Sequence, residues 1–239
     1  MNMWRNALTA LALLCALPLG AQTVEPLRPA EAAMFAAVGV VNSEGPLGDR
    51  GCTGTLIAPD LVLTAAHCVG DAVGTRWFMP GGLGPRARAA VPSRAIHIHP
   101  AYAEREGMAR FAVDLALLHL ARPLPASVVR PLPLLEGEAR NATQFATIGF
   151  LRSGTLAPVG HFDCPLRQGR LNRQMELGCP VVSGNSGGPA LLRRPAGWRV
   201  AGVLVARLGT GEETTALTAP PDRWLRETVA ALSGTPRGG

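Results

Sequence analysis

The sequence predicts an all-β fold, because short apolar runs alternate with turn-forming residues along most of the chain. Runs of strand length bounded by Gly, Pro and Asp are typical of β-sandwiches and β-barrels. The length, 239 residues, suffices for one large β domain or two small ones. The runs that predict strands are Ala36–Asn42, Gly54–Ile57, Leu61–Thr64, Arg94–Ile98, Leu115–Leu120, Gln144–Phe150, Ala190–Arg194 and Trp198–Ala206.

The first residues have the pattern of a secretory signal, which we place at residues 1–21. Arg5 supplies the positive start, Ala7–Leu19 the apolar run, and Gly20 with Ala21 a small-residue cleavage site. The apolar run is too short to favour a membrane span. We therefore expect an exported protein, periplasmic or extracellular, without a stable membrane anchor. Residues 22–35 would then form an N-terminal arm or a short propeptide.

A helix is predicted near the C-terminus, within residues 221–239. Asp222 precedes Arg223–Leu232 and is a good N-cap residue. Apolar residues recur at helical spacing, which predicts a stripe that packs on the domain. The stripe consists of Trp224, Leu225, Val229 and Leu232. Upstream, the Pro-rich stretch Arg122–Pro133 is the best candidate for a linker.

The charge pattern argues against nucleic-acid binding. The formal net charge is +6, and every basic residue is an arginine. These arginines are scattered, whereas a nucleic-acid interface needs a dense basic patch. We therefore expect most of them to be solvated.

Removal of the signal leaves an even number of cysteines, Cys52, Cys68, Cys164 and Cys179. In an exported chain, an even number of cysteines predicts disulfides, and four residues allow three pairings. A zinc site is not expected, because no Cys-x-x-Cys pair occurs. The pair His97 and His99 could share a strand face, but no third ligand is evident, so we expect no metal.

Three separate segments contain the side chains needed for nucleophilic catalysis. Ser186 lies in the glycine-rich run Gly184–Pro189, where the backbone can bend sharply and approach a substrate carbonyl. His67 lies in Leu63–Cys68 and could act as the base. Asp114 precedes Leu-Ala-Leu-Leu, where a carboxylate is costly to bury without a partner.

The order of these residues decides between two classes of hydrolase. The run around Ser186 also fits the G-x-S-x-G elbow of α/β-hydrolases, which needs a histidine after the serine. All five histidines precede Ser186. The order His67, Asp114, Ser186 is instead that of chymotrypsin-type enzymes.

The chain resembles the chymotrypsin/trypsin family of serine endopeptidases, in a compact bacterial form. Four motifs in family order carry the resemblance, which runs from about Val38 to the C-terminal helix. They are Gly51–Ile57, Leu63–Cys68, Asp114–Leu118 and Gly184–Pro189.

The resemblance implies a fold of two six-stranded antiparallel β-barrels with the active site between them and a C-terminal α-helix. Residues 36–130 would form the first barrel, with His67 and Asp114, and residues 131–220 the second, with Ser186. It also implies an oxyanion hole from the N–H groups of Gly184 and Ser186. The implied disulfide pairs are Cys52–Cys68 and Cys164–Cys179. Such a protein would need no cofactor, would act on protein or peptide substrates, and is expected to be a monomer.

Two positions depart from the trypsin pattern. Asn185 stands where many relatives have an Asp that pairs with a new N-terminal ammonium, and Ala37–Val40 is only loosely similar to the mature start. With Asn at position 185, the chain resembles the glutamyl-endopeptidase-like bacterial branch of the family, where the oxyanion loop is set differently. We therefore expect the oxyanion loop to form without an ionic N-terminus.

The substrate preference stays open. No acidic residue occurs in Leu177–Pro189, and Pro180 stands where an Asp would receive a basic side chain. Arg207 could favour acidic groups, but Glu212 and Glu213 could cancel its charge, and a small or apolar pocket is equally compatible.

We therefore predict a secreted serine endopeptidase that forms an acyl-enzyme intermediate. Two alternatives remain. One is a non-catalytic protease-like binding module. The other is an inactive precursor that loses part of Gln22–Phe35.

Overall fold

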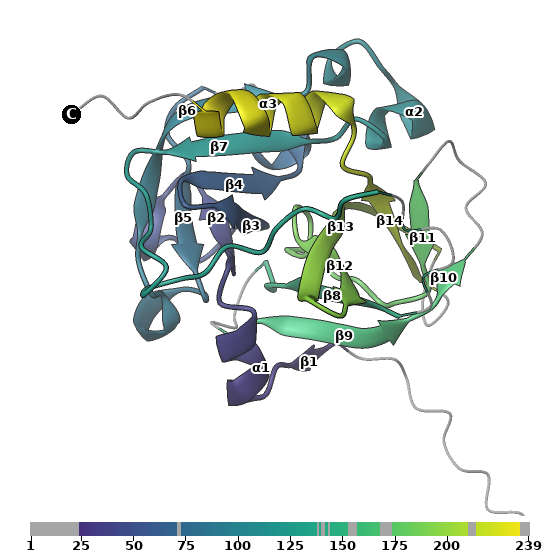
Figure 1. Ribbon diagram of the computed structural model, residues 1–239, viewed down its shortest axis with the longest axis horizontal. Helices are drawn as coiled ribbons and strands as arrows, with labels where there is room; N and C mark the ends of the chain where they lie inside the picture. Colours follow the sequence, from purple (N-terminus) through teal and green to yellow (C-terminus); the bar gives the residue numbers. More distant parts are fainter. Residues whose placement is uncertain are drawn as a thin grey trace, which may run out of the picture.

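The computed structural model describes residues 24–70, 73–137, 139, 142, 144–152, 157–167, 174–209 and 214–234. The predicted signal and the last five residues lie outside this part. The chain forms two β units side by side, with the C-terminal helix lying across one of them (Figure 1). The predicted fold class, all-β with a C-terminal helix, is confirmed.

The first unit is a closed antiparallel barrel of six strands. Around the barrel the strands follow the order β2-β3-β4-β7-β6-β5. In β4 the side chains alternate between two clusters, because Leu61 and Leu63 pack toward the second unit and Val62 packs inside the barrel. The strands are β2 (Val38–Asn42), β3 (Cys52–Ala58), β4 (Leu61–Thr64), β5 (Trp77–Pro80), β6 (Val91–Ile98) and β7 (Ala116–Leu120).

The second unit is an eight-stranded sheet with the order β1-β9-β8-β12-β13-β14-β11-β10. Strands β9 and β10 are separated only by Pro165, yet β9 pairs with β8 near one edge of the sheet and β10 pairs with β11 at the other edge. The two edges therefore lie close together, and the sheet is strongly curled. The disulfide Cys164–Cys179 joins the same two edges. The strands are β1 (Glu25–Pro26), β8 (Phe145–Gly149), β9 (Val159–Cys164), β10 (Leu166–Arg167), β11 (Met175–Leu177), β12 (Pro189–Arg194), β13 (Gly197–Leu208) and β14 (Thr215–Ala219).

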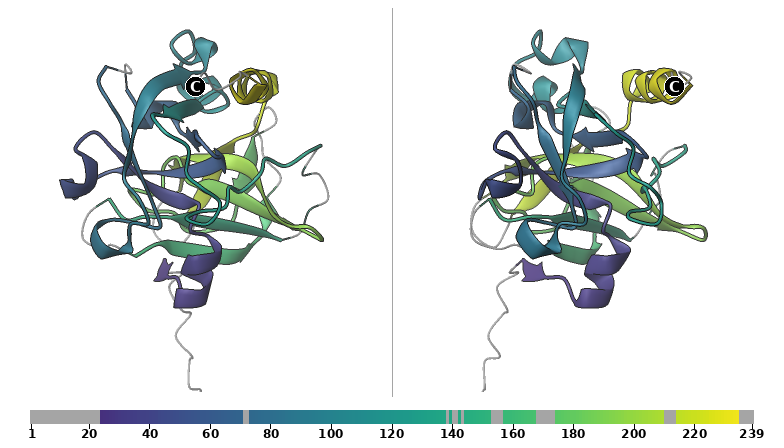
Figure 2. Two further views of the ribbon diagram at one scale, coloured as in Figure 1. Left: turned by 60° about the vertical axis from the view of Figure 1, so that its left-hand side comes forward. Right: turned by 90° about the vertical axis from the view of Figure 1, so that its left-hand side faces the viewer.

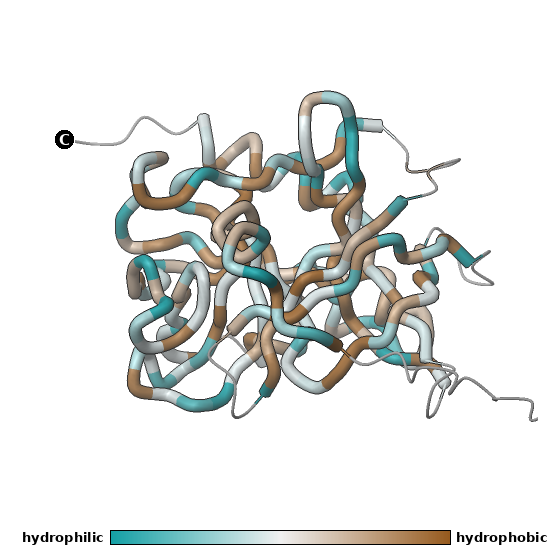
Figure 3. The backbone as a smooth tube through the Cα atoms, turned by 90° about the horizontal axis from the view of Figure 1, so that it is seen from below, coloured by the Kyte–Doolittle hydropathy of each residue, from teal (hydrophilic) through white to brown (hydrophobic). Residues whose placement is uncertain are grey.

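Apolar packing joins the two units. One buried cluster contains Leu63 and Leu117 of the first unit together with Ile148, Leu191 and Leu217 of the second. Hydrophilic stretches are frequent in the peripheral loops (Figure 3), whereas β4 and β7 are buried along their whole length. The seam between the units is therefore a packed core.

The N-terminal arm crosses from the second unit to the first. Its strand β1 pairs with β9, and helix α1 (Pro29–Met34) leads to Phe35. The Phe35 ring is buried against Phe162 and Trp198 of the second unit. The chain then enters β2, which pairs with strands on both sides. The segment Ala37–Val40 is thus built into the first barrel and is not placed as a free mature start.

The two remaining helices lie at the same end of the molecule (Figures 1 and 2). They are α2 (Gly107–Phe111) and α3 (Arg223–Gly234). As predicted, Asp222 caps α3, since its Oδ1 accepts the N–H of Leu225 at 2.9 Å. Asp222 Oδ2 also lies 2.9 Å from His99 Nε2 of the first barrel. In the described part of the chain, no helix has the length and apolar character needed to cross a membrane.

Candidate active site

Pairing between two neighbouring strands brings His67 and Asp114 together. His67 lies on a 3₁₀ turn, Ala66–Cys68, that follows β4, and Asp114 lies two residues before β7. Because Thr64 of β4 is paired with Ala116 of β7, the two side chains meet at the same edge of the barrel. Both residues of this pair therefore come from the first unit.

Both oxygens of the Asp114 carboxylate bind His67. The imidazole Nδ1 lies 2.6 Å from Oδ2, and the backbone N–H donates to Oδ1 at 2.9 Å. The Asp114 side chain is 3% exposed, whereas that of His67 is 35% exposed. A buried carboxylate fixed in this way holds the proton on Nδ1, so Nε2 is the nitrogen left to accept a proton.

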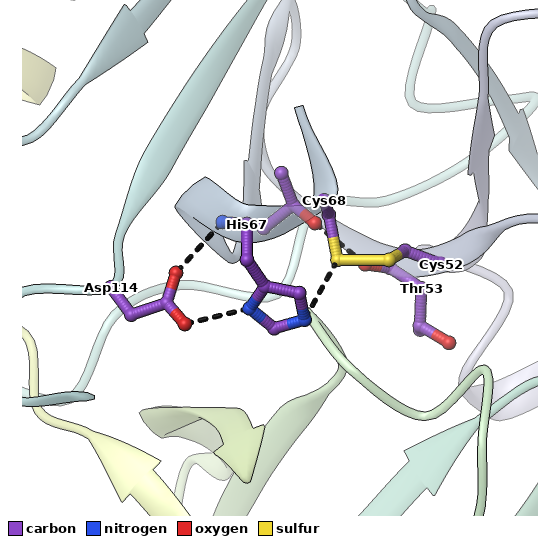
Figure 4. Close-up of polar contacts among 6 residues, drawn as sticks. Cys52, Thr53, His67, Cys68 and Asp114 are labelled. Carbon is purple, nitrogen blue, oxygen red and sulfur yellow. Dashed lines mark hydrogen bonds and ion pairs between the residues drawn. A yellow bond between two sulfur atoms is a disulfide. The ribbon is translucent and has the colours of Figure 1, made fainter. Parts of the chain in front are cut away.

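The disulfide Cys52–Cys68 lies on the opposite side of the imidazole. Its Sγ at Cys68 is 3.6 Å from His67 Nε2, and Figure 4 shows the ring between the carboxylate and the disulfide. Cys52, His67 and Cys68 are close enough to resemble a metal-binding group. Two of these ligands are disulfide sulfurs, which cannot act as thiolates, so the group does not fit a metal site. Both disulfides expected from the resemblance are present.

Ser186 lies on a tight loop whose glycines are required by its geometry. Gly184 and Gly187 have φ values of +103° and +82°, a region that other residues seldom adopt. A Cβ on Gly187 would overlap the backbone O of Thr53 and Oγ1 of Thr64. The loop can therefore lie directly against the first barrel only with glycine at position 187.

Two backbone N–H groups of this loop stay available to a ligand. The N–H groups of Asn185, Gly187 and Gly188 all donate within the protein. Those of Gly184 and Ser186 have no acceptor among the hydrogen bonds of the described residues. Two such donors on either side of one residue could bind an oxyanion.

Asn185 holds the loop in shape through both ends of its amide. It is 4% exposed. Its Nδ2 donates to the backbone O of Phe150 at 3.1 Å, and its Oδ1 accepts the N–H of Val182 at 3.0 Å. The second bond needs an acceptor, which an Asp would also offer, but the first needs a donor, which an Asp lacks.

A threonine of the first barrel connects this loop to the strand beside His67. Thr53 donates its N–H to the backbone O of Ser186 at 2.8 Å and its Oγ1 to the backbone O of Gly184 at 2.7 Å. Its neighbour Cys52 is bonded to Cys68, which adjoins His67. The serine loop and the histidine turn therefore share one supporting strand, β3.

The hydroxyl of Ser186 and Nε2 of His67 are not hydrogen-bonded partners in the described part of the structure. Hydrogen bonds between a nucleophile and its base are often long in enzymes without substrate. The backbone contacts above still place the two residues on either side of the seam between the units.

A cavity of about 150 Å³ lies beside Ser186. A cavity of this size can hold one benzene-sized group, so it suits a single side chain. Among the described residues of its lining, Arg207 of β13, which is exposed, is the only charged one, and none is a carboxylate. Glu212 and Glu213 lie outside the described residues. The lining residues are Val181, Val182, Ser183, Asn185, Ser186, Leu204, Ala206 and Arg207.

The sequence did not reveal the roles of Thr53 and Thr64. Thr64 Oγ1 donates to the backbone O of Thr53 at 2.8 Å. Both residues fall in the motifs quoted above, but nothing local shows that they contact a loop more than 100 positions away. Strand β4 ends at Thr64, so a polar residue there is compatible with an ordinary strand end.

Comparison with known proteins agrees with this geometry. The model of the Trypsin family matches residues 28–221. Among solved structures, the chain is similar to a thermostable serine protease, AL20, from an extremophilic microorganism. The TM-score is 0.68 at 16% sequence identity, and the match covers 85% of this chain and 99% of the other. At that identity, the structural match supports the fold alone.

Proposed function

The chain belongs to the trypsin family of serine proteases, and from this premise we propose that it is a secreted endopeptidase with the triad Ser186, His67 and Asp114. The observation that carries the proposal is the use of both Asp114 oxygens by His67. A core histidine would not need a buried carboxylate fixed on its Nδ1 and its backbone at once. That arrangement is what a general base requires.

In the proposed reaction, Ser186 Oγ attacks the scissile carbonyl while His67 Nε2 takes the hydroxyl proton. The carbonyl oxygen becomes an oxyanion and accepts hydrogen bonds from the N–H groups of Gly184 and Ser186. His67 then gives the proton to the leaving amine, and an acyl-enzyme remains on Ser186. Water repeats the sequence with His67 as base and releases the acid product. Asp114 stabilises the imidazolium in both halves.

The neutral amide of Asn185 supports a finer proposal about the branch of the family. Hydrogen bonds between the neutral Asn185 amide and the backbone of Phe150 and Val182 hold the oxyanion loop. We place the chain with relatives of the glutamyl-endopeptidase-like kind, whose loop needs no new ammonium group. Export agrees with the two disulfides, which persist in oxidising compartments.

The first test is labelling of the purified mature protein with a fluorophosphonate probe. We expect labelling of wild type, none of Ser186→Ala, and unchanged labelling of Ser127→Ala, an exposed serine on the connection between the barrels. Labelling that persists in Ser186→Ala would refute the assignment of the nucleophile.

Failure of the wild type to label would favour the two alternatives. Labelling that appears after limited proteolysis of the N-terminal arm indicates a precursor. Labelling that stays absent indicates a protease-like binding module.

A further inference from the structure

Thr53 makes more contacts with the serine loop than its place in the sequence suggests. It lies in β3, it is fully buried, and all its polar groups are engaged. Its N–H and Oγ1 donate to the carbonyl oxygens of Ser186 and Gly184. Its Oγ1 also accepts the N–H of Phe150 at 3.0 Å, and its carbonyl accepts Thr64 Oγ1.

The hydroxyl of Thr53 thus bridges two segments that form the loop's support. Gly184 carries one of the two free N–H groups, and Phe150 provides the carbonyl that binds the Asn185 amide. The two segments are also joined directly, because Arg152 N–H donates to the Ser183 carbonyl and the Asn185 amide to that of Phe150. The Thr53 hydroxyl, which donates to Gly184 and accepts from Phe150, ties both segments to β3. The strand that carries it belongs to the other barrel, the one that contains His67.

The geometry points to Thr53 as the positioning residue of the oxyanion loop, an inference that rests on the proposed function. Its hydroxyl fixes the Gly184 carbonyl from the first barrel, so that the two free N–H groups face the substrate when His67 is in place. The loop is thus supported twice, by the Thr53 hydroxyl of β3 and by the amide of Asn185, which belongs to the loop itself. Thr53 does not touch the substrate.

A second threonine on the same strand provides a matched control. Thr55 is also buried, two residues further along β3, but its Oγ1 has no hydrogen-bond partner among the residues that the structure describes. Threonine and valine have nearly the same shape, so Thr53→Val and Thr55→Val each remove one hydroxyl from one strand. Only the first removes a bond to the serine loop.

The kinetic test compares kcat and KM for a peptide substrate at a temperature where circular dichroism shows every variant to be folded. We expect Thr53→Val to lower kcat by about 10- to 100-fold with little change in KM, because a misplacement of about 1 Å at a reacting group has an effect of that size. Thr53→Ser restores most of the loss, since it keeps the hydroxyl. Equal kcat values in Thr53→Val and Thr55→Val would overturn the inference.

A readout that does not need catalysis separates this inference from the proposed function. Amide hydrogen exchange in the peptide that spans Val182–Gly188 should be faster in Thr53→Val than in wild type and unchanged in Thr55→Val. If the wild type neither hydrolyses nor labels while this exchange difference is present, the proposed function is wrong and the positioning role stands. If the wild type labels but the exchange does not differ, the positioning role is wrong.

Discussion

The histidine turn and the serine loop are built in different ways, although both serve the same candidate site. His67 and Asp114 lie at the ends of neighbouring strands of one closed barrel, and strand register alone brings them together. The serine loop belongs to the other unit and obtains its shape partly from Thr53 across the seam. The proposed base is thus assembled within one unit, whereas the loop of the proposed nucleophile depends on both.

This difference indicates that the His67–Asp114 pair and the serine loop can be perturbed separately by mutation. Changes at Asp114, at the edge of the first barrel, should alter its pair with His67 without moving the loop. Changes at the seam should move the loop while this pair stays intact.

The largest effect should come from breaking the pair inside the first barrel. Asp114→Asn places an amide opposite Nδ1 and favours the wrong imidazole tautomer, so kcat should fall by about 10⁴-fold. The control is Asp60→Asn, which changes a carboxylate 3.4 Å from His119 in the same barrel. Steady-state kinetics measure both, and a loss below about tenfold in Asp114→Asn would contradict the assigned role.

The next effect concerns the stability of the fold at Phe35, where the N-terminal arm passes from the second unit to the first. Phe35 is 2% exposed and packs on Phe162 and Trp198. Its replacement in Phe35→Ala should lower the free energy of unfolding by about 3–5 kcal/mol. Met34→Ala, at a side chain that is 61% exposed, should change it little. Urea denaturation measures the loss, and a small loss in Phe35→Ala would favour a removable propeptide.

A smaller effect is expected within the serine loop. In Asn185→Asp the carbonyl of Phe150 loses its donor, so stability should fall by about 1–3 kcal/mol and labelling should slow. Asn42→Asp is a control, because the Asn42 amide bonds both backbone groups of Gly45 away from the site. That variant should lose stability but label at the normal rate. Much higher activity in Asn185→Asp, dependent on N-terminal trimming, would show that an ionic N-terminus sets this loop.

The smallest effect concerns the cavity beside Ser186. Because Arg207 is the one charged residue among the described lining residues, the cavity should prefer a substrate with Glu over one with Gln before the cleaved bond by about two- to fivefold. Arg207→Gln should bring this ratio to about one, whereas Arg122→Gln, on the connection between the barrels, should not. Paired kcat/KM values at low salt measure the ratio. A ratio near one in wild type would indicate a small or apolar preference.

Strands with a continuous apolar run were predicted well from the sequence. Strands that form mainly because neighbouring strands pair with them were predicted poorly. The run Leu61–Thr64 coincides with β4, and Ala190–Arg194 lies within β12. Strands β5, β9 and β14 were not predicted. β5 is only four residues long and ends at Pro80, whereas Gly160 and the threonines of β14 interrupt the apolar pattern of the other two. These strands pair on both sides, and that tertiary pairing outweighs local preference.

The candidate site likewise has parts that the sequence predicts and parts that it does not. The motifs around His67, Asp114 and Ser186 could be found in the sequence, because each chemistry needs particular residues in a particular order. The contacts of Thr53 could not, since the sequence does not show which strand of one barrel faces which loop of the other. The arm was predicted without its strand β1 and helix α1, which are too short to leave a periodic pattern.

The pairing of β1 with β9 also affects the order in which the chain can fold. Glu25 is paired with Gly160, so this strand finds its partner only after the whole first barrel has been synthesised. Contacts between such distant positions raise the contact order and slow folding. Docking of the arm should therefore be a late folding step, and the fluorescence of Trp198, which packs on Phe35, should report its rate.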